Sequence, residues 1–202
     1  TMNLALAFNG NLSNVRSLKS FLKAEGAVFH GSSDGEVLAL LLLHYLKDHD
    51  LISAVELLMK KVDGAYSVVG LTSNGQMFVF RDPFGIRPLV YGFNGDHNIF
   101  AAASESVALN VNGVSLSGFV KPGELLIISE DRRLNSHLID SRGESLCSFE
   151  YAYFARPDSK LHNNKYVYEI RRELGRRLAY RYSHISSLVD FVVPVPQTAV
   201  DA

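Results

Sequence analysis

The strongest constraint on the fold is a change of hydrophobic pattern near Ala65. Before this residue most apolar side chains recur at helical spacing, and after it short extended apolar segments alternate with turn residues. Strands that follow one another through short turns pair in antiparallel fashion, because parallel pairing needs a long crossover connection. The sequence therefore predicts helices packed beside an antiparallel meander, which is an α+β fold.

The first part of the chain is predicted to hold one strand and three helices. The strand covers residues 4–8, and the helices cover residues 15–22, 33–46 and 52–62. Asn9 and Gly10 lie between the strand and the first helix, and we interpret this favoured turn pair as a loop. Ser33 and Glu36 have the spacing of a capping box at a helix start.

The second part of the chain is predicted to hold a series of short strands. They cover residues 66–71, 76–81, 89–93, 99–103, 114–116, 124–128 and 138–139. The segment from Arg81 to Leu89 contains a turn bounded by proline and glycine. We expect Asp82 to close this turn and Arg87 to brace it, which gives both residues an architectural role.

A shift in composition after Phe154 predicts a domain boundary, with one domain over residues 1–154 and the start of another over 155–202. In the second, residues 166–182 have helical periodicity, and residues 190–196 form an apolar run typical of a strand covered on both faces. Between Lys165 and Tyr182 there are six Lys or Arg and two Glu, so this helix is basic. We interpret these charges as its solvated face, because they lie opposite an apolar stripe.

Composition excludes several classes of protein. The formal net charge of −1 gives nucleic acid no overall attraction, and the longest apolar run, residues 37–43, is far shorter than the roughly 20 residues that span a bilayer. Cys147 is the only cysteine, so no disulfide within the chain is expected and a reducing compartment is indicated. The histidines lack metal-ligand spacing, so no metal site is predicted. No signal peptide is visible, and we expect a cytoplasmic protein with neither nucleic acid nor membrane as partner.

Asn9 and Gly10 are the sharpest chemical feature of the chain. An acyl-transfer site needs donors directed at the oxygen that gains negative charge, and a side-chain amide beside a glycine N–H supplies two of them. Taken alone, the dipeptide is better explained as a turn. Cys147 has no neighbouring motif that would activate its thiol, so we interpret it as a structural cysteine.

The segment Phe8-Asn9-Gly10-Asn11-Leu12 resembles the His-Asn-Gly-Asn-Leu element of the class II glutamine amidotransferases. Further segments similar to this family follow in the family's order, at residues 33–36, 63–67, 81–89, 103–106 and 121–124. Residues 147–159 are especially similar to the amidophosphoribosyltransferase branch. The resemblance implies an N-terminal-nucleophile hydrolase domain with αββα layers over residues 1–154, followed by the start of an α/β phosphoribosyltransferase domain.

The resemblance also implies a function. Such enzymes release ammonia from glutamine and transfer it to phosphoribosyl pyrophosphate, giving 5-phosphoribosylamine for purine biosynthesis. Asn9 and Gly10 would form the oxyanion hole, and Asp34 would bind the glutamine α-ammonium. Thr198 is a weaker candidate beside phosphoribosyl pyrophosphate and magnesium. Members of the family are commonly homo-oligomers when full length.

Some positions depart from the family pattern. Phe8 replaces the usual histidine, Gly35 replaces the usual Ser or Thr, and Gln197 breaks the pattern before Thr198. In the family a catalytic cysteine and an arginine-containing segment precede the Asn-Gly element, so the sequence predicts a chain cut at both ends and inactive alone. An iron–sulfur cluster is not expected, since clusters normally take four cysteines and Cys147 is one.

Two other interpretations stay open. The chain could be a degenerate, non-catalytic subunit that keeps the glutaminase fold, which the change at Phe8 favours. It could also be another class II amidotransferase such as glucosamine-phosphate synthase, which the similarity of residues 149–159 to the amidophosphoribosyltransferase branch disfavours.

Overall fold

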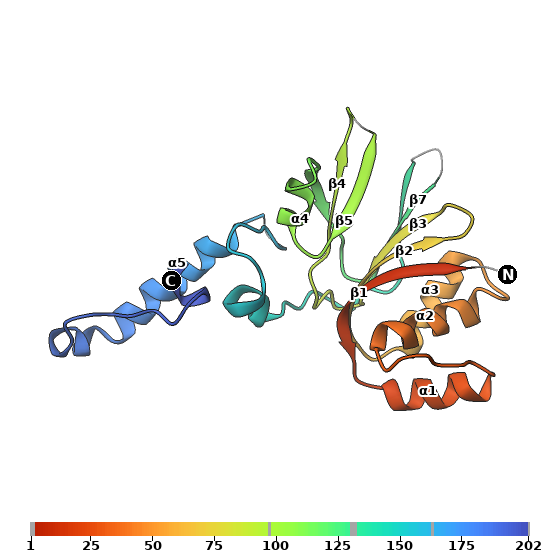
Figure 1. Cartoon of the computed structure of the whole chain (residues 1–202), viewed down its shortest axis with the longest axis horizontal. Helices are drawn as coiled ribbons and strands as arrows, with labels where there is room; N and C mark the ends of the chain where they lie inside the picture. The colour runs from red at the N-terminus through yellow and green to blue at the C-terminus, as the bar shows by residue number, and fades with distance from the viewer. Residues whose placement is uncertain (1–2, 97, 130–132, 163, 202) are drawn as a thin grey trace.

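The computed structural model describes residues 3–96, 98–129, 133–162 and 164–201, which include two antiparallel sheets flanked by helices (Figure 1). The larger sheet has the strand order β1-β2-β3-β7-β8 and the smaller has the order β5-β4-β6. The larger sheet consists of β1 (Leu4–Leu12), β2 (Gly64–Thr72), β3 (Met77–Arg81), β7 (Glu124–Ile128) and β8 (Leu134–Leu138). The smaller sheet consists of β4 (Val90–Asn94), β5 (Ile99–Ala103) and β6 (Ser115–Phe119).

Helices cover the outer face of each sheet. The helices beside the larger sheet are α1 (Val15–Ala24), α2 (Asp34–Tyr45) and α3 (Leu51–Lys61), and the short α4 (Ser106–Asn110) packs on the smaller sheet. The inner faces of the two sheets share a core that includes Val79, Leu89 and Leu126. The predicted α+β fold is therefore confirmed, and its layers follow the helix, sheet, sheet, helix order.

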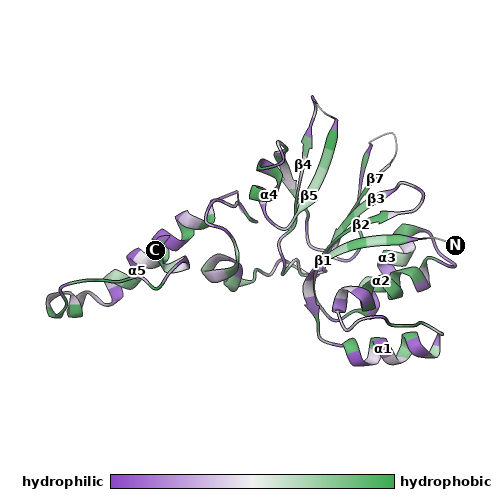
Figure 2. Cartoon of the chain, in the orientation of Figure 1, coloured by the Kyte–Doolittle hydropathy of each residue, from purple (hydrophilic) through white to green (hydrophobic). Residues whose placement is uncertain are grey.

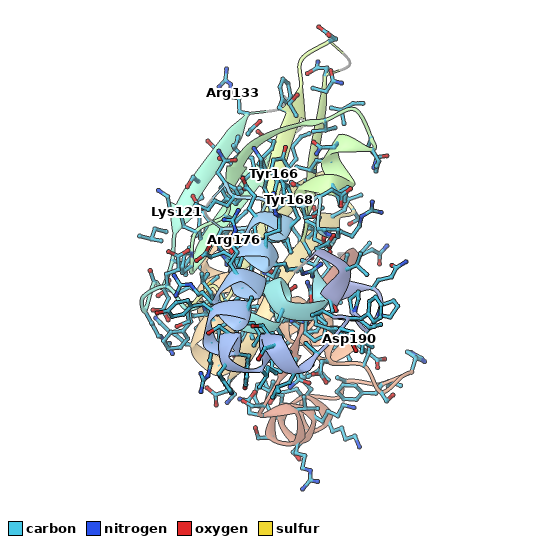
Figure 3. All side chains as sticks on the ribbon, turned by 90° about the vertical axis from the view of Figure 1, so that its left-hand side faces the viewer. Lys121, Arg133, Tyr166, Tyr168, Arg176 and Asp190 are labelled. Carbon is cyan, nitrogen blue, oxygen red and sulfur yellow. The ribbon has the colours of Figure 1, made fainter. Side chains whose placement is uncertain are left out.

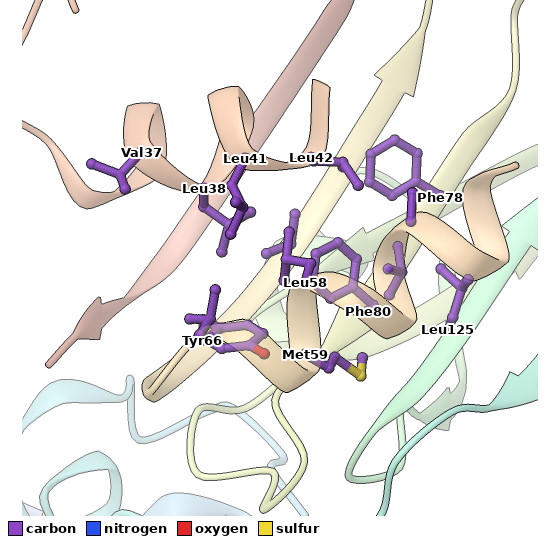
Figure 4. Packing of buried hydrophobic residues seen from close by; sticks show 14 of the residues in the cluster. Val37, Leu38, Leu41, Leu42, Leu58, Met59, Tyr66, Phe78, Phe80 and Leu125 are labelled. Carbon is purple, nitrogen blue, oxygen red and sulfur yellow. The ribbon is translucent and has the colours of Figure 1, made fainter. Parts of the chain in front are cut away.

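Strand β3 lies inside this sandwich because both of its faces are covered. Phe78 and Phe80 point toward the helices and pack with residues such as Leu58 (Figure 4), whereas Val79 points toward the smaller sheet. Each such side chain contributes about 1.5–3 kcal/mol when fully buried. The hydropathy of the residues agrees with this burial of the strands. The strands are largely hydrophobic, whereas hydrophilic and hydrophobic residues alternate along α1 and α5 (Figure 2).

The predicted elements are largely confirmed, with shifted ends. The short helix α4 was not predicted, because its five residues are too few for a periodic pattern. At the start of α2, the Ser33 side chain accepts a hydrogen bond from the Glu36 N–H as a capping box requires. The Glu36 carboxylate does not return to Ser33 and instead accepts from the N–H groups of His30 and Gly31.

The C-terminal part leaves the sandwich through a π-helical turn, Glu150–Phe154, and continues as α5 (Val167–Arg181), which projects away from both sheets (Figure 1). The strand predicted over residues 190–196 is wrong. A strand needs a neighbour for its backbone groups, and these residues pair with no other described segment. The apolar side chains of Phe191, Val192 and Val193 are accordingly 81% to 90% exposed. None of the described helices combines the length and apolar character needed to cross a bilayer.

The interpretation of the basic helix as a solvated face is wrong for one residue. Arg171 is 3% exposed, and its guanidinium donates from Nε to the Tyr151 carbonyl at 2.8 Å and from Nη2 to the Ala155 carbonyl at 2.7 Å. It thereby caps the end of the π-helical turn, which periodicity alone does not reveal. Arg176 is exposed near Tyr166 and Tyr168, as the view along α5 shows (Figure 3).

Gly70 of β2 offers a test of the helix-side packing. A Cβ at this position would lie 2.0 Å from Cζ of the Phe78 ring, so Gly70→Ala forces a buried ring out of its place. We expect a loss of about 1–3 kcal/mol of unfolding free energy, measured by chemical denaturation. The matched control is Gly95→Ala, because a Cβ there has no neighbour closer than 4.0 Å. Equal midpoints for the two variants would contradict the packing described for Phe78.

Candidate active site

Asn9 and Gly10 lie inside strand β1, where Asn9 is opposite Ser67 and Gly10 is opposite Tyr66 of β2. The interpretation of this pair as a loop is wrong, because pairing with β2 outweighs the local turn preference of the dipeptide. Glycine is needed here for close approach: a Cβ on Gly10 would lie 2.2 Å from the Ala65 carbonyl oxygen. The Asn-Gly pair is therefore held rigidly in a sheet.

The Gly10 N–H faces the open edge of the larger sheet. Antiparallel residues alternate between pointing their backbone groups at the partner strand and pointing them away. Ser13 N–H donates toward β2, to the Asp63 carbonyl at 2.8 Å, and Tyr66 bonds on its other side to Asp82. Even-numbered residues of β1 therefore direct their N–H groups outward, and β1 is one of the two edge strands of this sheet as described. This leaves the Gly10 N–H available to a ligand.

Asp34 lies on the same edge. It begins α2, and its Oδ2 accepts a hydrogen bond from the outward N–H of Leu12 at 2.8 Å. Leu12 is two residues beyond Gly10, which corresponds to about 7 Å along a strand. No described residue donates to the other carboxylate oxygen, Oδ1. The structure thus places a hydrogen-bond donor and a carboxylate side by side on one exposed edge.

The Asn9 side chain points between the two sheets. It shares this face with Ser67, its partner across the strand pair, and with Arg81, the partner of Ser67 on β3. Asn9 Nδ2 donates to Ser104 Oγ at 2.9 Å, which joins the larger sheet to the end of β5. Ser67 Oγ donates to the Arg87 carbonyl at 3.1 Å. A polar row therefore runs across three strands at this end of an otherwise apolar interface.

Arg81 closes the inner end of the row. Its guanidinium is 1% exposed and donates to the carbonyls of Arg87 at 2.6 Å and Val120 at 2.7 Å, and to that of Gly85. Nη2 also contacts His162 Nδ1 at 2.7 Å. Burial lowers the pKa of Arg81 to about 10, so the group stays charged at neutral pH. Sequence reasoning missed this role, because the acceptors are backbone carbonyls that carry no sequence signal.

Asp82 closes the turn, as predicted. Its carboxylate accepts from the N–H groups of Phe84 at 2.9 Å, Ile86 at 3.0 Å and Tyr66 at 3.2 Å. Burial raises the pKa of Asp82, and these three hydrogen bonds oppose that rise. Arg87 braces a different segment from the one expected, since its Nη1 binds Glu150 Oε1 at 2.8 Å in the π-helical turn.

The two motif departures on the helix side, Phe8 and Gly35, lie against each other. A Cβ on Gly35 would be 3.2 Å from Phe8 Cβ, and the Phe8 ring also covers Gly10. Both residues line a groove of about 370 Å³ between β1 and α2. A Cβ at position 35 would contact Phe8 mainly at its Cβ, whereas the nearest ring atoms, at 3.6 and 3.7 Å, would be at ordinary van der Waals distance.

Comparison with known proteins is consistent with this geometry. A family model described as the glutamine amidotransferase domain matches residues 1–111, which include the Asn9-Gly10 pair and Asp34. The chain belongs to the glutamine amidotransferase family. Residues 1–111 cover β1, all three helices of the first layer and most of both sheets.

Among proteins of known name, this amidotransferase chain is 38% identical to the amidophosphoribosyltransferase of Bacillus subtilis, over 98% of the chain and 40% of that protein. It is 35% identical to the amidophosphoribosyltransferase of Methanocaldococcus jannaschii, over 98% of the chain and 44% of that protein. The chain therefore spans about two fifths of the length of these relatives.

Solved structures give the same result. The glutamine phosphoribosylpyrophosphate amidotransferase of B. subtilis, complexed with ADP and GMP, matches with a TM-score of 0.84 and 37% identity over 98% of the chain and 42% of its own. A structure described as the allosteric regulatory enzyme of purine biosynthesis also has a TM-score of 0.84, at 34% identity, over 100% of the chain and 42% of its own. The N-terminal-nucleophile hydrolase type of fold is thus shown for this chain.

The remaining predicted site residue lies elsewhere in the amidotransferase chain. Thr198 begins a short 3-10 turn, Thr198–Asp201, that packs against α5, whereas Asn9, Gly10 and Asp34 gather at the end of β1. Cys147 is half-buried on the segment between β8 and the π-helical turn, where its N–H donates to the Ile86 carbonyl. No three His, Cys, Asp or Glu side chains of the described ranges are placed to hold a metal ion.

The contact between Phe8 and Gly35 predicts coupled effects of substitution. Gly35→Thr should cost about 1–3 kcal/mol of unfolding free energy in the presence of Phe8, because the added atoms crowd the ring. In the Phe8→Ala background the change should cost less, because the ring is gone, although the Cβ at position 8 that a Cβ on Gly35 would contact at 3.2 Å remains. Urea unfolding of the two single variants and the double variant measures the coupling. Additive losses would mean that the two side-chain positions do not compete for space.

The contact between Arg81 and His162 predicts a dependence of stability on pH. Burial, followed by the nearby Arg81 charge, lowers the pKa of His162 from 6.5 to about 4. The unfolded chain binds the proton more readily between these values, so stability should fall as the pH drops below about 6.5, by about 2 kcal/mol between pH 7 and pH 5. Denaturation at both pH values measures this, and His162→Gln should remove that part of the change. An unaltered pH dependence in the variant would contradict burial of a neutral imidazole.

Proposed function

We propose that this chain forms the glutamine-hydrolysing part of an amidophosphoribosyltransferase. The observation that carries the proposal is that the Gly10 N–H and the Asp34 carboxylate, which is bound by the Leu12 N–H, lie along the same strand edge. The identity of 34% to 38% with amidophosphoribosyltransferases over almost the whole chain supports this branch over glucosamine-phosphate synthase. The change at Phe8 is the argument for a non-catalytic subunit, and nothing in the similarity to these relatives adds to it.

The spacing along β1 suits glutamine. In an extended glutamine, the α-nitrogen and the side-chain amide carbon are separated by four bonds, or about 5 Å. An α-ammonium bound to Asp34 Oδ1 would therefore bring the amide carbonyl to the Gly10 N–H, about 7 Å along the strand from Leu12. Asn9 precedes Gly10, so its side-chain amide approaches the same carbonyl oxygen from the inter-sheet side.

The chemistry proposed for this site is acyl transfer. A thiolate adds to the amide carbon, and the oxygen that gains negative charge is stabilised by the Gly10 N–H and the Asn9 amide. The carbon–nitrogen bond then breaks, the nitrogen takes up a proton and leaves as ammonia, and water hydrolyses the thioester to glutamate. Cys147 is the only thiol of the 202 residues and lies on the segment before the π-helical turn. We therefore propose that the nucleophile comes from other residues and that these 202 residues alone do not hydrolyse glutamine.

The rest of the proposal concerns residues 155–202, which we assign to the start of a phosphoribosyltransferase domain. Ammonia would there displace pyrophosphate from phosphoribosyl pyrophosphate, giving 5-phosphoribosylamine. Magnesium would accompany the pyrophosphate, and Thr198 would offer it one hydroxyl. The described residues include no group of three His, Cys, Asp or Glu that could hold the ion by themselves. We further propose a cytoplasmic location, in keeping with the single cysteine, and a homo-oligomeric assembly, which the family resemblance implies.

Activity with two nitrogen donors tests the proposal. In the protein as the cell makes it, Asn9→Ala should lower the glutamine-dependent formation of phosphoribosylamine by about 100-fold or more, because an oxyanion donor is lost. Added ammonia bypasses glutamine hydrolysis, so ammonia-dependent activity should be preserved. Asp34→Asn should mainly raise the KM for glutamine.

The control is Asn3→Ala, an exposed asparagine just before β1 whose replacement should change neither activity. Equal loss of both activities in Asn9→Ala would place Asn9 outside the glutamine site. Hydrolysis of glutamine by the purified 202-residue chain would contradict the proposed origin of the nucleophile.

A further inference from the structure

Asn9 is held by a side chain from the other sheet. Its Nδ2 donates to Ser104 Oγ at 2.9 Å across 95 positions of sequence, and no other described side chain binds this amide. A carboxamide has two N–H donors fixed in one plane. When one is bound to Ser104, the direction of the second is set as well. Ser104 thereby determines where the free N–H of Asn9 points.

Ser104 itself sits on a short connection that a distant segment holds in place. It lies between the end of β5 and Glu105, the residue that precedes α4. Glu105 Oε2 accepts from the Arg156 N–H at 2.9 Å and from Ser159 Oγ at 2.6 Å, and Ser159 is completely buried. Ser106 Oγ accepts from the Lys160 N–H at 2.7 Å. Residues 156–160 therefore bind the residues on the C-terminal side of Ser104 by three hydrogen bonds.

We propose that Ser104 is a positioning residue for the Asn9 amide, and that docking of residues 156–160 on Glu105 and Ser106 keeps it in place. Ser104 does not touch the reacting atoms; it acts by aligning Asn9 with the oxygen that the Gly10 N–H also binds. Residues 156–160 lead from the π-helical turn to α5, so the alignment of the site depends on where the C-terminal part of the chain is docked. The effect of Ser104 on catalysis rests on the proposed function, whereas the contact between Ser104 and Asn9 does not.

Nuclear magnetic resonance of the 202-residue chain tests the contact. The two side-chain amide signals of Asn9, assigned by their loss in Asn9→Asp, should shift and exchange faster with water in Ser104→Ala. Ser104→Thr keeps the hydroxyl and should restore them. Glu105→Ala should move the same signals by a smaller amount, while Ser117→Ala, an exposed serine on β6, should leave them unchanged. Unchanged Asn9 signals in Ser104→Ala would overturn the proposal, and unchanged signals in Glu105→Ala would overturn the role of residues 156–160.

Kinetics of the protein as the cell makes it test the consequence. Ser104→Ala should lower kcat for glutamine hydrolysis by about tenfold or more with little change in KM, because alignment of a donor is lost and substrate binding at Asp34 is not. Ser104→Thr should recover most of kcat. Displaced Asn9 signals together with an unchanged kcat would overturn the positioning role. Displaced signals in a protein whose wild type does not hydrolyse glutamine would refute the proposed function instead, with the contact intact.

Discussion

The buried guanidinium of Arg81 is the interaction on which the rest of the structure depends. It joins the end of β3 to the carbonyls of the turn that follows and to Val120, which leads into β7. Burying a charged group is costly unless its donors are satisfied. Here backbone carbonyls and His162 bind the guanidinium donors. Arg81 is therefore satisfied only when the larger sheet, the turn and the C-terminal segment are all folded together.

The same end of the sandwich creates the candidate site. Because β1 is an edge strand among the described residues, every second N–H of its backbone has no partner strand within them. The start of α2 uses one of these groups, Leu12, to fix the Asp34 carboxylate, and leaves Gly10 open. The inward face of the same strand carries Asn9 to Ser104. Strand β1 thus supplies both a backbone donor, the Gly10 N–H, and a side-chain donor, the Asn9 amide. Its pairing with β2 determines the direction in which each donor points.

Much of the fold could be predicted from the sequence, because residues on the buried face of a helix or strand recur at a regular spacing along the chain. The α+β class follows from helical spacing before Ala65 and short strands after it, whereas the four layers were expected only from the resemblance to the family. The errors have physical reasons. Asn9 and Gly10 look like a turn locally, yet close approach of β2 keeps them in a strand. Residues 190–196 have the composition of a buried strand without a neighbour to pair with. Ser104 could not be connected with Asn9, since their contact depends on packing of two sheets.

Departures from a family motif are better judged in space than one position at a time. From the sequence alone, Phe8 in place of histidine indicates that the site has lost a polar side chain. Gly35 in place of Ser or Thr indicates a less stable start of the helix. In the structure the two positions are neighbours, since a Cβ on Gly35 would lie 3.2 Å from the Phe8 Cβ. The backbone of β1 keeps its course beside them, so that Gly10 still faces the open edge and Leu12 still binds Asp34. A pair of substitutions that preserves packing is therefore weak support for a degenerate site, because the hydrogen-bonding groups of β1 and α2 remain in register.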